Sequence, residues 1–342
     1  MPAKALDFYL PEALNASYPP EKRGVRRDHV RMMVLDRNTG ETKHDQFFHL
    51  TNYLQPGDLV ILNNSRTIPA VLQAEWIRED VVIASAVEVR LARRRQEDTW
   101  EALIVANSIK DGDQLQFSQA LSATVVGSKE NSPLKTIIFS KKGTELFNII
   151  YAVGEPVRYE YIEQPWELDY YQTVFASHPG SVEMPSAGRA FSWELIFKMK
   201  HKGILLDFIQ LHTGLSYLLD DQWHQTPEDN VEEYHIPDST MERIQQTKAA
   251  GSRVIAVGTT VVRALETAAS TGKRTGQTNL YIDQGFPLQI ADGIITGLHE
   301  PKASHLDMLS AFVSGSHLSK AYNQAIACGY LWHEFGDMNL IL

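Results

Sequence analysis

The sequence predicts an α/β domain with an inserted β-barrel-like domain. Residues 70–159 contain short segments in which apolar and polar side chains alternate, whereas strand-like and helix-like patterns alternate on either side of that stretch. The chain has 342 residues, which is more than a single core usually needs, so two domains are expected. We therefore assign residues 1–65 and 160–342 to a discontinuous α/β catalytic domain, and residues 66–159 to the inserted barrel.

The segment before residue 66 has the pattern of strand, turn and strand. The apolar run 31–36 is followed by a polar turn at 37–40, and a second apolar run, 59–62, follows Gly57. Within the inserted segment, residues 87–91 place valine and leucine on one side and charged side chains on the other. This period of two is typical of the strands of a small barrel or sandwich.

Helices and strands alternate again after residue 170. Ser192 and Gly203 suit the start and the end of one helix, and Ser239 with Glu242 forms a capping box for another. The apolar run 254–257 then predicts a buried strand that leads through a tight turn into a further helix. Such units build an α/β sheet.

Composition limits the classes of function. The net charge of −10 argues against a protein that coats nucleic acid without specificity. Basic residues do cluster at 22–31 and at 93–95, either as a local patch for nucleic acid or as solvated surface. Neither a leader sequence nor an apolar stretch of about 18 residues is apparent, so we expect a cytoplasmic protein without a membrane partner.

Several residues lie where α/β proteins carry chemistry. The turn Gly258-Thr259-Thr260 would either bind an anion at a helix N-terminus or only cap that helix. His212 and His299 each follow an apolar run, where a strand end would present them to a site, although a lone histidine is more often structural. The twelve histidines show no paired ligand spacing, so we expect no metal.

Short motifs that follow one another along nearly the whole chain carry more information than any of these residues alone. They are Asp7-Phe8, Leu10-Pro11-Glu12, Val34-Leu35-Asp36-Arg37, Pro56-Gly57-Asp58-Leu59, Leu62-Asn63-Asn64-Ser65-Arg66, Tyr171-Gln172-Thr173, Pro185-Ser186-Ala187-Gly188, Gly258-Thr259-Thr260 with Arg263, Gly293 through His299 to Lys302, and Gly336-Asp337. In this order they resemble the S-adenosylmethionine:tRNA ribosyltransferase-isomerases of queuosine biosynthesis. No single motif is decisive, but the ordered set is specific. The fold of that family, an α/β domain with an inserted β-barrel, agrees with the pattern described above.

The resemblance implies an enzyme with S-adenosylmethionine as co-substrate and no metal. Such an enzyme transfers and isomerises the ribosyl part onto the aminomethyl-deazaguanine in the anticodon region of a tRNA. It gives epoxyqueuosine and releases adenine and methionine. The reaction needs a base at the ribose 5′ carbon beside the sulfonium, and an acid for adenine departure.

The family motifs supply candidates for each role. The catalytic candidates are His212, His299, Asp337 and Glu233, and the candidates for binding the co-substrate are Gly258, Thr259, Thr260, Lys302, Ser186 and Gly188. The candidates for binding the acceptor are Asn63, Asn64, Arg66, Tyr171, Gln172 and Arg263. Asp337 is equally compatible with a turn, because it follows Gly336. We expect the protein to act as a monomer.

Some positions inside the motifs depart from the family, and they leave the acceptor open. They are Arg189, Ala190, Leu215, Tyr217, Val231, Glu300, His305, Asp307, His333 and Glu334. One alternative is a divergent paralogue that uses S-adenosylmethionine with a non-tRNA acceptor or cleaves it without transfer. Another is an RNA- or nucleotide-binding module without catalysis. His212, His299, Lys302 and Asp337, which match the family, argue against a loss of catalysis.

Overall fold

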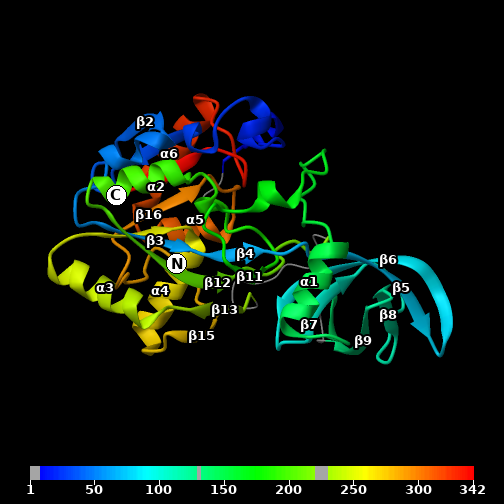
Figure 1. Ribbon diagram of the computed structural model, residues 1–342. Helices are drawn as coiled ribbons and strands as arrows, with labels where there is room; N and C mark the ends of the chain where they lie inside the picture. The colour runs from blue at the N-terminus through cyan, green and yellow to red at the C-terminus, as the bar shows by residue number, and fades with distance from the viewer. Residues whose placement is uncertain (1–7, 129–131, 220–229) are drawn as a thin grey trace.

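The body of the molecule is a mixed nine-stranded sheet with helices on both faces (Figure 1). The computed structural model describes residues 8–128, 132–219 and 230–342, and every structural statement below concerns those residues. In spatial order the strands are β15 (Thr275–Thr278), β13 (Glu232–His235), β12 (Leu205–His212), β3 (Leu59–Asn63), β14 (Val254–Val257), β16 (Gly293–Gly297), β17 (Met338–Ile341), β1 (Arg31–Leu35) and β2 (Thr42–Gln46).

The centre of this sheet is parallel and fully buried. Strands β12, β3, β14 and β16 run parallel to one another, and every residue of β3 and β14 is buried. Strands covered on both faces contain nearly continuous apolar runs, which explains why the sequence marks β3 and β14 so clearly. Antiparallel strands flank the centre, because β13 pairs with β12 and β17 pairs with β16.

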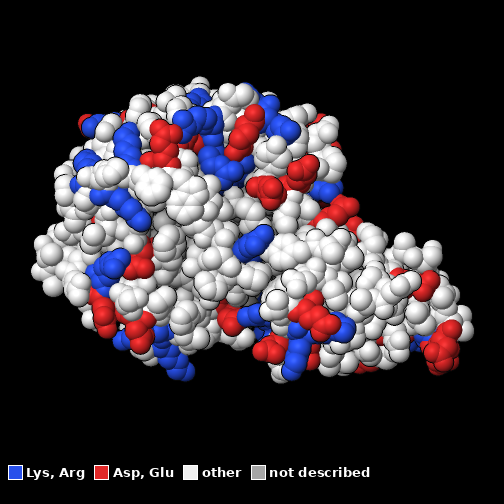
Figure 2. Space-filling view, in the orientation of Figure 1, with Lys and Arg blue, Asp and Glu red and all other residues white. Residues whose placement is uncertain are grey.

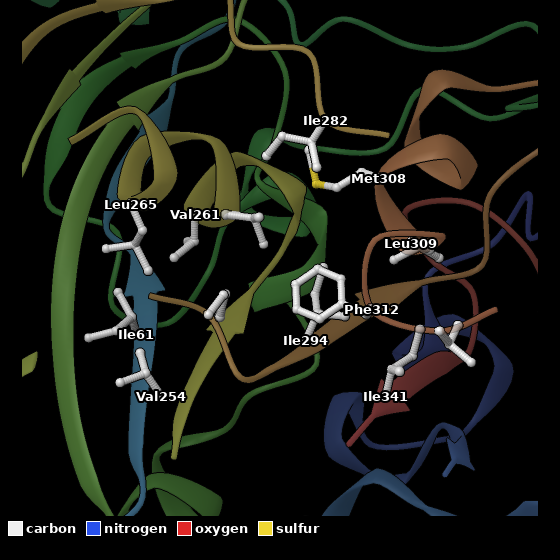
Figure 3. Close-up of a cluster of buried hydrophobic side chains, with 14 of the residues drawn as sticks. Ile61, Val254, Val261, Leu265, Ile282, Ile294, Met308, Leu309, Phe312 and Ile341 are labelled. Atoms are coloured by element: carbon white, nitrogen blue, oxygen red, sulfur yellow. The ribbon is translucent and has the colours of Figure 1, made fainter. Parts of the chain in front are cut away.

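Two hydrophobic clusters cover the two faces of the sheet. In β3, Leu59 and Ile61 belong to one cluster, and Val60 and Leu62 belong to the other, as the alternation of a strand requires. Figure 3 shows the first cluster, in which helix α4 packs over Ile61. The helices are α2 (Trp193–His201), α3 (Asp238–Ala249), α4 (Thr259–Thr271), α5 (Ser304–Leu309) and α6 (Gly315–Ala327).

The helix ends test the predicted caps. Ser192 caps α2, because its Oγ accepts from the N–H of Leu195 at 3.0 Å. Gly203 follows the end of α2 with a φ of 82°, as predicted from the need for a left-handed residue there. The capping box at Ser239 was wrong, since α3 begins one residue earlier at Asp238, after Pro237. Because Pro237 has a fixed φ and stands at the N-cap position, the helix starts there without a side-chain hydroxyl that caps it.

The inserted unit is a closed six-stranded antiparallel barrel, which projects to one side of the body (Figure 1). Around the barrel the strands are β10 (Leu134–Phe139), β7 (Thr99–Ile104), β6 (Val81–Arg94), β5 (Val71–Arg78), β8 (Gln114–Ser118) and β9 (Leu121–Ser128). Helix α1 (Gly143–Val153) packs Leu146 and Ile150 into the barrel core. The predicted fold class is therefore confirmed, and the domain boundaries at residues 66 and 159 stay a prediction.

Short elements connect the barrel to the body. Strand β4 (Ser65–Thr67) continues from β3 toward the barrel and pairs with β11 (His178–Ser181). The 3-10 helices are η1 (Glu12–Leu14), η2 (Pro20–Arg23), η3 (Arg27–His29), η4 (Phe47–Asn52), η5 (Leu168–Tyr171) and η6 (Ser186–Gly188). Among the described residues, no helix has both the length and the apolar character needed to span a membrane.

Candidate active site

A cavity of about 640 Å³ opens at the carboxyl ends of the central parallel strands. Thr213 and Gly214 follow β12, Gly258 follows β14, and Thr296 and His299 lie at the end of β16. All five residues line the cavity. Ligands of open α/β sheets bind at this edge, because the loops there are free of the core packing that fixes the strands.

The N-terminus of α4 forms one wall of this cavity. Gly258, Thr259 and Thr260 all line it, and α4 begins at Thr259. Gly258 has a φ of 93°, and a Cβ added to it would lie 3.2 Å from the Cβ of Ala187, so glycine suits this turn. The first N–H groups of a helix have no partner inside the helix and favour an anion. Lys302 lines the same cavity, so an anionic ligand has two candidate partners there.

An ion pair between Glu232 and Arg263 lies in another wall. Glu232 is 5% exposed, and its Oε1 also accepts from the N–H of Gly214 at 3.2 Å. The next residue, Glu233, was predicted to be catalytic. Because side chains alternate along β13, Glu233 faces the other side and pairs with Arg94 at 2.9 Å, outside the cavity lining.

A second cavity, of about 250 Å³, adjoins the first. The two share several lining residues, which are Tyr159, Glu183, Met184, Ser186, Ser216, His299 and His305. The smaller cavity extends from these toward residues of distant segments, which are Tyr161, Tyr171, Glu300, His333 and Glu334. The two cavities therefore form one site with a main chamber and a side chamber, as we call them below.

Buried carboxylates distinguish the side chamber. The hydroxyl of Tyr159 donates to Oε2 of Glu183 at 2.6 Å, and the N–H of Ser216 donates to its Oε1 at 2.7 Å. The hydroxyl of Tyr161 donates to Oε2 of Glu334. Burial raises the pKa of Glu334 to about 7, and burial also raises the pKa of Glu183. Glu334 can therefore exchange protons close to neutral pH.

Three histidines border the same space. The Nε2 of His299 lies 2.8 Å from Oγ1 of Thr296, and its ring stacks on His305 with centroids 4.6 Å apart. Burial, with the neighbouring His305 and His333, lowers the pKa of His299 well below its usual value, and burial lowers the pKa of His305 and of His333 to about 4. These imidazoles are neutral at pH 7 and can accept a proton.

His212 does not line either chamber, although we predicted it as catalytic. Its Nδ1 lies 2.7 Å from Oγ of Ser65, which in turn lies 2.6 Å from Oγ of Ser181. A Cβ added to Gly180 would lie 2.6 Å from that Nδ1, so the ring is packed against the backbone. Burial, followed by the charge of Arg94, lowers the pKa of His212 to about 4. These neighbours pack the ring where β12 meets β4 and β11, outside the lining of both chambers.

Asp337 also lies outside both chambers. Its carboxylate accepts from the N–H of Arg31 at 2.8 Å, from the guanidinium of Arg31 at 3.0 Å and from the N–H of Leu331 at 2.8 Å. These bonds attach the start of β1 to the segment before β17. A carboxylate used in this way holds β1 to the segment before β17, and it does not line the site.

The remaining predicted residues divide in the same way. Ser186 lines both chambers, Arg263 lines the main chamber and Tyr171 lines the side chamber. The amides of Asn63 and Gln172 bind backbone groups of Leu211 and Thr67, and Gly188 packs against Phe175. Asn64 holds β11 through its carbonyl, and Arg66 stacks over Tyr151, so neither lines a chamber.

Sequence reasoning missed Tyr159, Tyr161 and Glu183 as residues of the site. Tyr159 ends the predicted insertion and Tyr161 lies just beyond it, where no strand or helix pattern marks either residue. Glu183 follows β11, a strand of four residues that the sequence analysis did not predict. The pair Glu183-Met184 immediately before the Pro185-Ser186 motif was the one available signal. Within the described residues, no group of His, Cys, Asp or Glu side chains is arranged to hold a metal ion.

The basic clusters of the sequence are largely neutralised by acids. Arg26 pairs with Glu194 at 2.5 Å and Arg27 pairs with Glu21 at 3.2 Å. In the second cluster, Arg95 pairs with Glu101. On the face drawn in Figure 2, basic and acidic side chains are interspersed over the body. On this face a polynucleotide would therefore meet single basic side chains and not a continuous basic stripe.

Comparison with known proteins identifies the family. A model of the queuosine biosynthesis protein family matches residues 3–341. The chain belongs to this family. It is similar to the solved structure of S-adenosylmethionine tRNA ribosyltransferase from Thermotoga maritima, with 30% sequence identity and a TM-score of 0.56. The alignment covers 98% of this chain and 99% of that chain, so the family resemblance of the motifs is confirmed.

The departures from the family motifs fall into two groups in space. Arg189 is 2% exposed and pairs with Glu21 at 2.8 Å, while Leu215 belongs to the core of the barrel. Ala190 is likewise buried, Tyr217 donates to Glu160 at 3.1 Å, and Val231 precedes β13. The second group lines the site: Glu300, His305, His333 and Glu334 line the side chamber, and Asp307 lines the main chamber. This second group adds titratable side chains to the lining of the site.

Proposed function

We propose that this chain is an S-adenosylmethionine-dependent tRNA ribosyltransferase-isomerase. In this proposal it transfers the ribosyl part of its co-substrate to an aminomethyl-deazaguanine in the anticodon region of a tRNA. The product is epoxyqueuosine, and adenine and methionine leave. The observation that carries the proposal is the two-chamber site at the carboxyl ends of the sheet, in a chain of the queuosine biosynthesis family.

The main chamber has the groups that S-adenosylmethionine requires. Its volume of about 640 Å³ is within the usual range for small-molecule sites. The N-terminus of α4 and Lys302 suit the carboxylate of the methionine part. In another wall Glu232 and Arg263 form an ion pair, so the chamber contains charged groups of both signs. The mixture of charges matches a ligand that carries both signs.

His299 has the properties of the base that removes the ribose 5′ proton. Its imidazole is neutral, lines both chambers and is oriented by Thr296. The imidazolium that it would form has a low pKa and is therefore a strong enough acid to protonate the departing adenine. One side chain can thus serve in both proton transfers, and His305, stacked on it, excludes water from one ring face.

The test of this function is incubation with S-adenosylmethionine and tRNA that carries the aminomethyl precursor. Mass spectrometry of the nucleosides should show epoxyqueuosine, with equal amounts of free adenine and methionine. A matched reaction of His299→Asn should lose the product and keep co-substrate binding. Adenine release without a modified nucleoside would contradict transfer to tRNA.

A second candidate is the same chemistry on a non-tRNA acceptor. The observation in its favour is that four departures from the family line the side chamber. If this candidate is correct, adenine and methionine appear with a small amine in place of tRNA, and the nucleosides of tRNA stay unchanged. We also propose that the protein acts as a monomer without a metal.

A further inference from the structure

We infer that the side chamber binds a primary ammonium group of the acceptor, with Glu334 and Tyr171 as its direct partners. This inference deepens the proposed function, because it assigns the acceptor to one chamber and names the residues that recognise it. The chamber has a volume of about 250 Å³, which is too small for the whole co-substrate and sufficient for one ring with its substituent.

The charges that line the side chamber have one sign. Glu183, Glu300 and Glu334 line it, and among the described residues neither lysine nor arginine does. The histidines of the chamber are neutral, because burial lowers the pKa of His333 to about 4, as it does that of His305. A cavity of this composition disfavours a phosphate or a carboxylate. It favours a cation, whose charge the carboxylates would balance.

Two buried polar atoms of the chamber have no hydrogen-bond partner among the described residues. They are Oε1 of Glu334 and the hydroxyl oxygen of Tyr171. A buried polar atom without a hydrogen bond costs about 1–3 kcal/mol, so two of them in one cavity point to a ligand that supplies the bonds. An ammonium group has three donors and no acceptor, and both oxygens can accept from it. A hydroxyl group has a single donor, so it could donate to only one of the two oxygens at a time.

Stacked rings form a platform beside these atoms. The rings of Tyr159 and Tyr161 stack with centroids 5.6 Å apart and an interplanar angle of 4°, and His333 stacks on Tyr161 at 4.1 Å. Electron-rich faces attract cations and also pack against planar heterocycles. The hydroxyl of Tyr161 holds Oε2 of Glu334, which fixes the carboxylate and leaves Oε1 for a ligand. An aminomethyl group on a planar ring fits both features.

The pH dependence of binding gives an additional readout. Burial raises the pKa of Glu334 to about 7. The hydrogen bond from Tyr161 and the charge of Arg189 lower this pKa, and the charge of Glu183 raises it. Below pH 7 Glu334 is protonated and loses its attraction for an ammonium group. His333 stays neutral across this range. The affinity for an amine should therefore rise between pH 6 and pH 8, and the rise should be absent in Glu334→Gln.

The experiment compares two free bases on the full chain saturated with S-adenosylmethionine. The probes are 7-aminomethyl-7-deazaguanine and 7-methyl-7-deazaguanine, and calorimetry measures their affinities. The native protein should bind the amine at least about tenfold more tightly, as expected for one charge-assisted hydrogen bond. Glu334→Gln should remove this preference. Tyr171→Phe should reduce it, and the control Glu145→Gln, on the exposed side of α1, should leave it unchanged.

The outcomes separate this inference from the proposed function. A preference for the amine that survives in both Glu334→Gln and Tyr171→Phe overturns the inference, and so does a native protein that binds neither probe or both equally. Circular dichroism identifies a variant that fails to fold, in which case the other variant decides. If tRNA is not modified but the preference is present and depends on Glu334, the proposed acceptor is wrong and the ammonium site stands.

Discussion

Glutamine substitutions at Glu232 and Glu233 test the orientation of β13 and the part of the site that it supports. The two residues are adjacent, yet Glu232 is 5% exposed and pairs with Arg263, whereas the side chain of Glu233 is 45% exposed and pairs with Arg94. Glu232→Gln leaves the guanidinium of Arg263 without its carboxylate in a wall that is largely removed from solvent. The carbonyl of Asn230, at 2.8 Å, still accepts from it.

These contacts set the expected magnitudes. Loss of a charged partner inside a buried wall costs about 2 kcal/mol when other acceptors remain. Loss of an exposed ion pair costs about 0.5 kcal/mol. Urea unfolding should therefore show a lower midpoint for Glu232→Gln than for Glu233→Gln at equal slope. Equal destabilisation by the two variants, or a larger effect of Glu233→Gln, would refute the assigned register of β13 and with it this wall of the main chamber.

The other predictions separate residues of the site from residues of the scaffold. His299→Ala should lower turnover about a hundredfold. His212→Ala should leave turnover within a few-fold and lower the free energy of unfolding by about 1–2 kcal/mol. Rate measurements and urea midpoints check this, and a hundredfold loss of turnover in His212→Ala contradicts it. Lys302→Met should weaken S-adenosylmethionine binding about tenfold in calorimetry, and unchanged affinity would exclude it from carboxylate binding. Asp337→Asn should cost about 2 kcal/mol in urea unfolding without changing that affinity, because its bonds attach Arg31.

Local sequence patterns predicted the helices and strands, because each of these elements is determined mainly by residues close to it in the sequence. A strand covered on both faces needs continuous apolar residues, and β14 shows them without exception. The alternation at 87–91 appears in the structure as part of β6, whose inward side chains fill the barrel. The hydroxyl of Ser192 and the conformation of Gly203 are likewise decided within one turn of α2.

The site was predicted less completely, because its geometry depends on tertiary contacts. Whether Glu232 or Glu233 faces the cavity depends on which face of β13 lies toward α4. The sequence of the strand is compatible with both orientations. His212 ends β12 as predicted, but close packing by Gly180 turns it toward Ser65 and not toward the cavity. A strand-end histidine can point to either side of a sheet, and no pattern within the strand distinguishes the two.

The positions of the departures indicate how this chain differs from its family. Residues that change at random would not meet in space, yet Glu300, His305, His333 and Glu334 come from two segments about 30 residues apart and line one chamber of 250 Å³. The motif residues around α4, by contrast, line the other chamber, where the co-substrate is proposed to bind. The departures that line the site are thus concentrated in the side chamber, while His305 lines both chambers and Asp307 lines the main one. In the proposed assignment of the two ligands, most of these departures therefore fall in the chamber that would bind the acceptor.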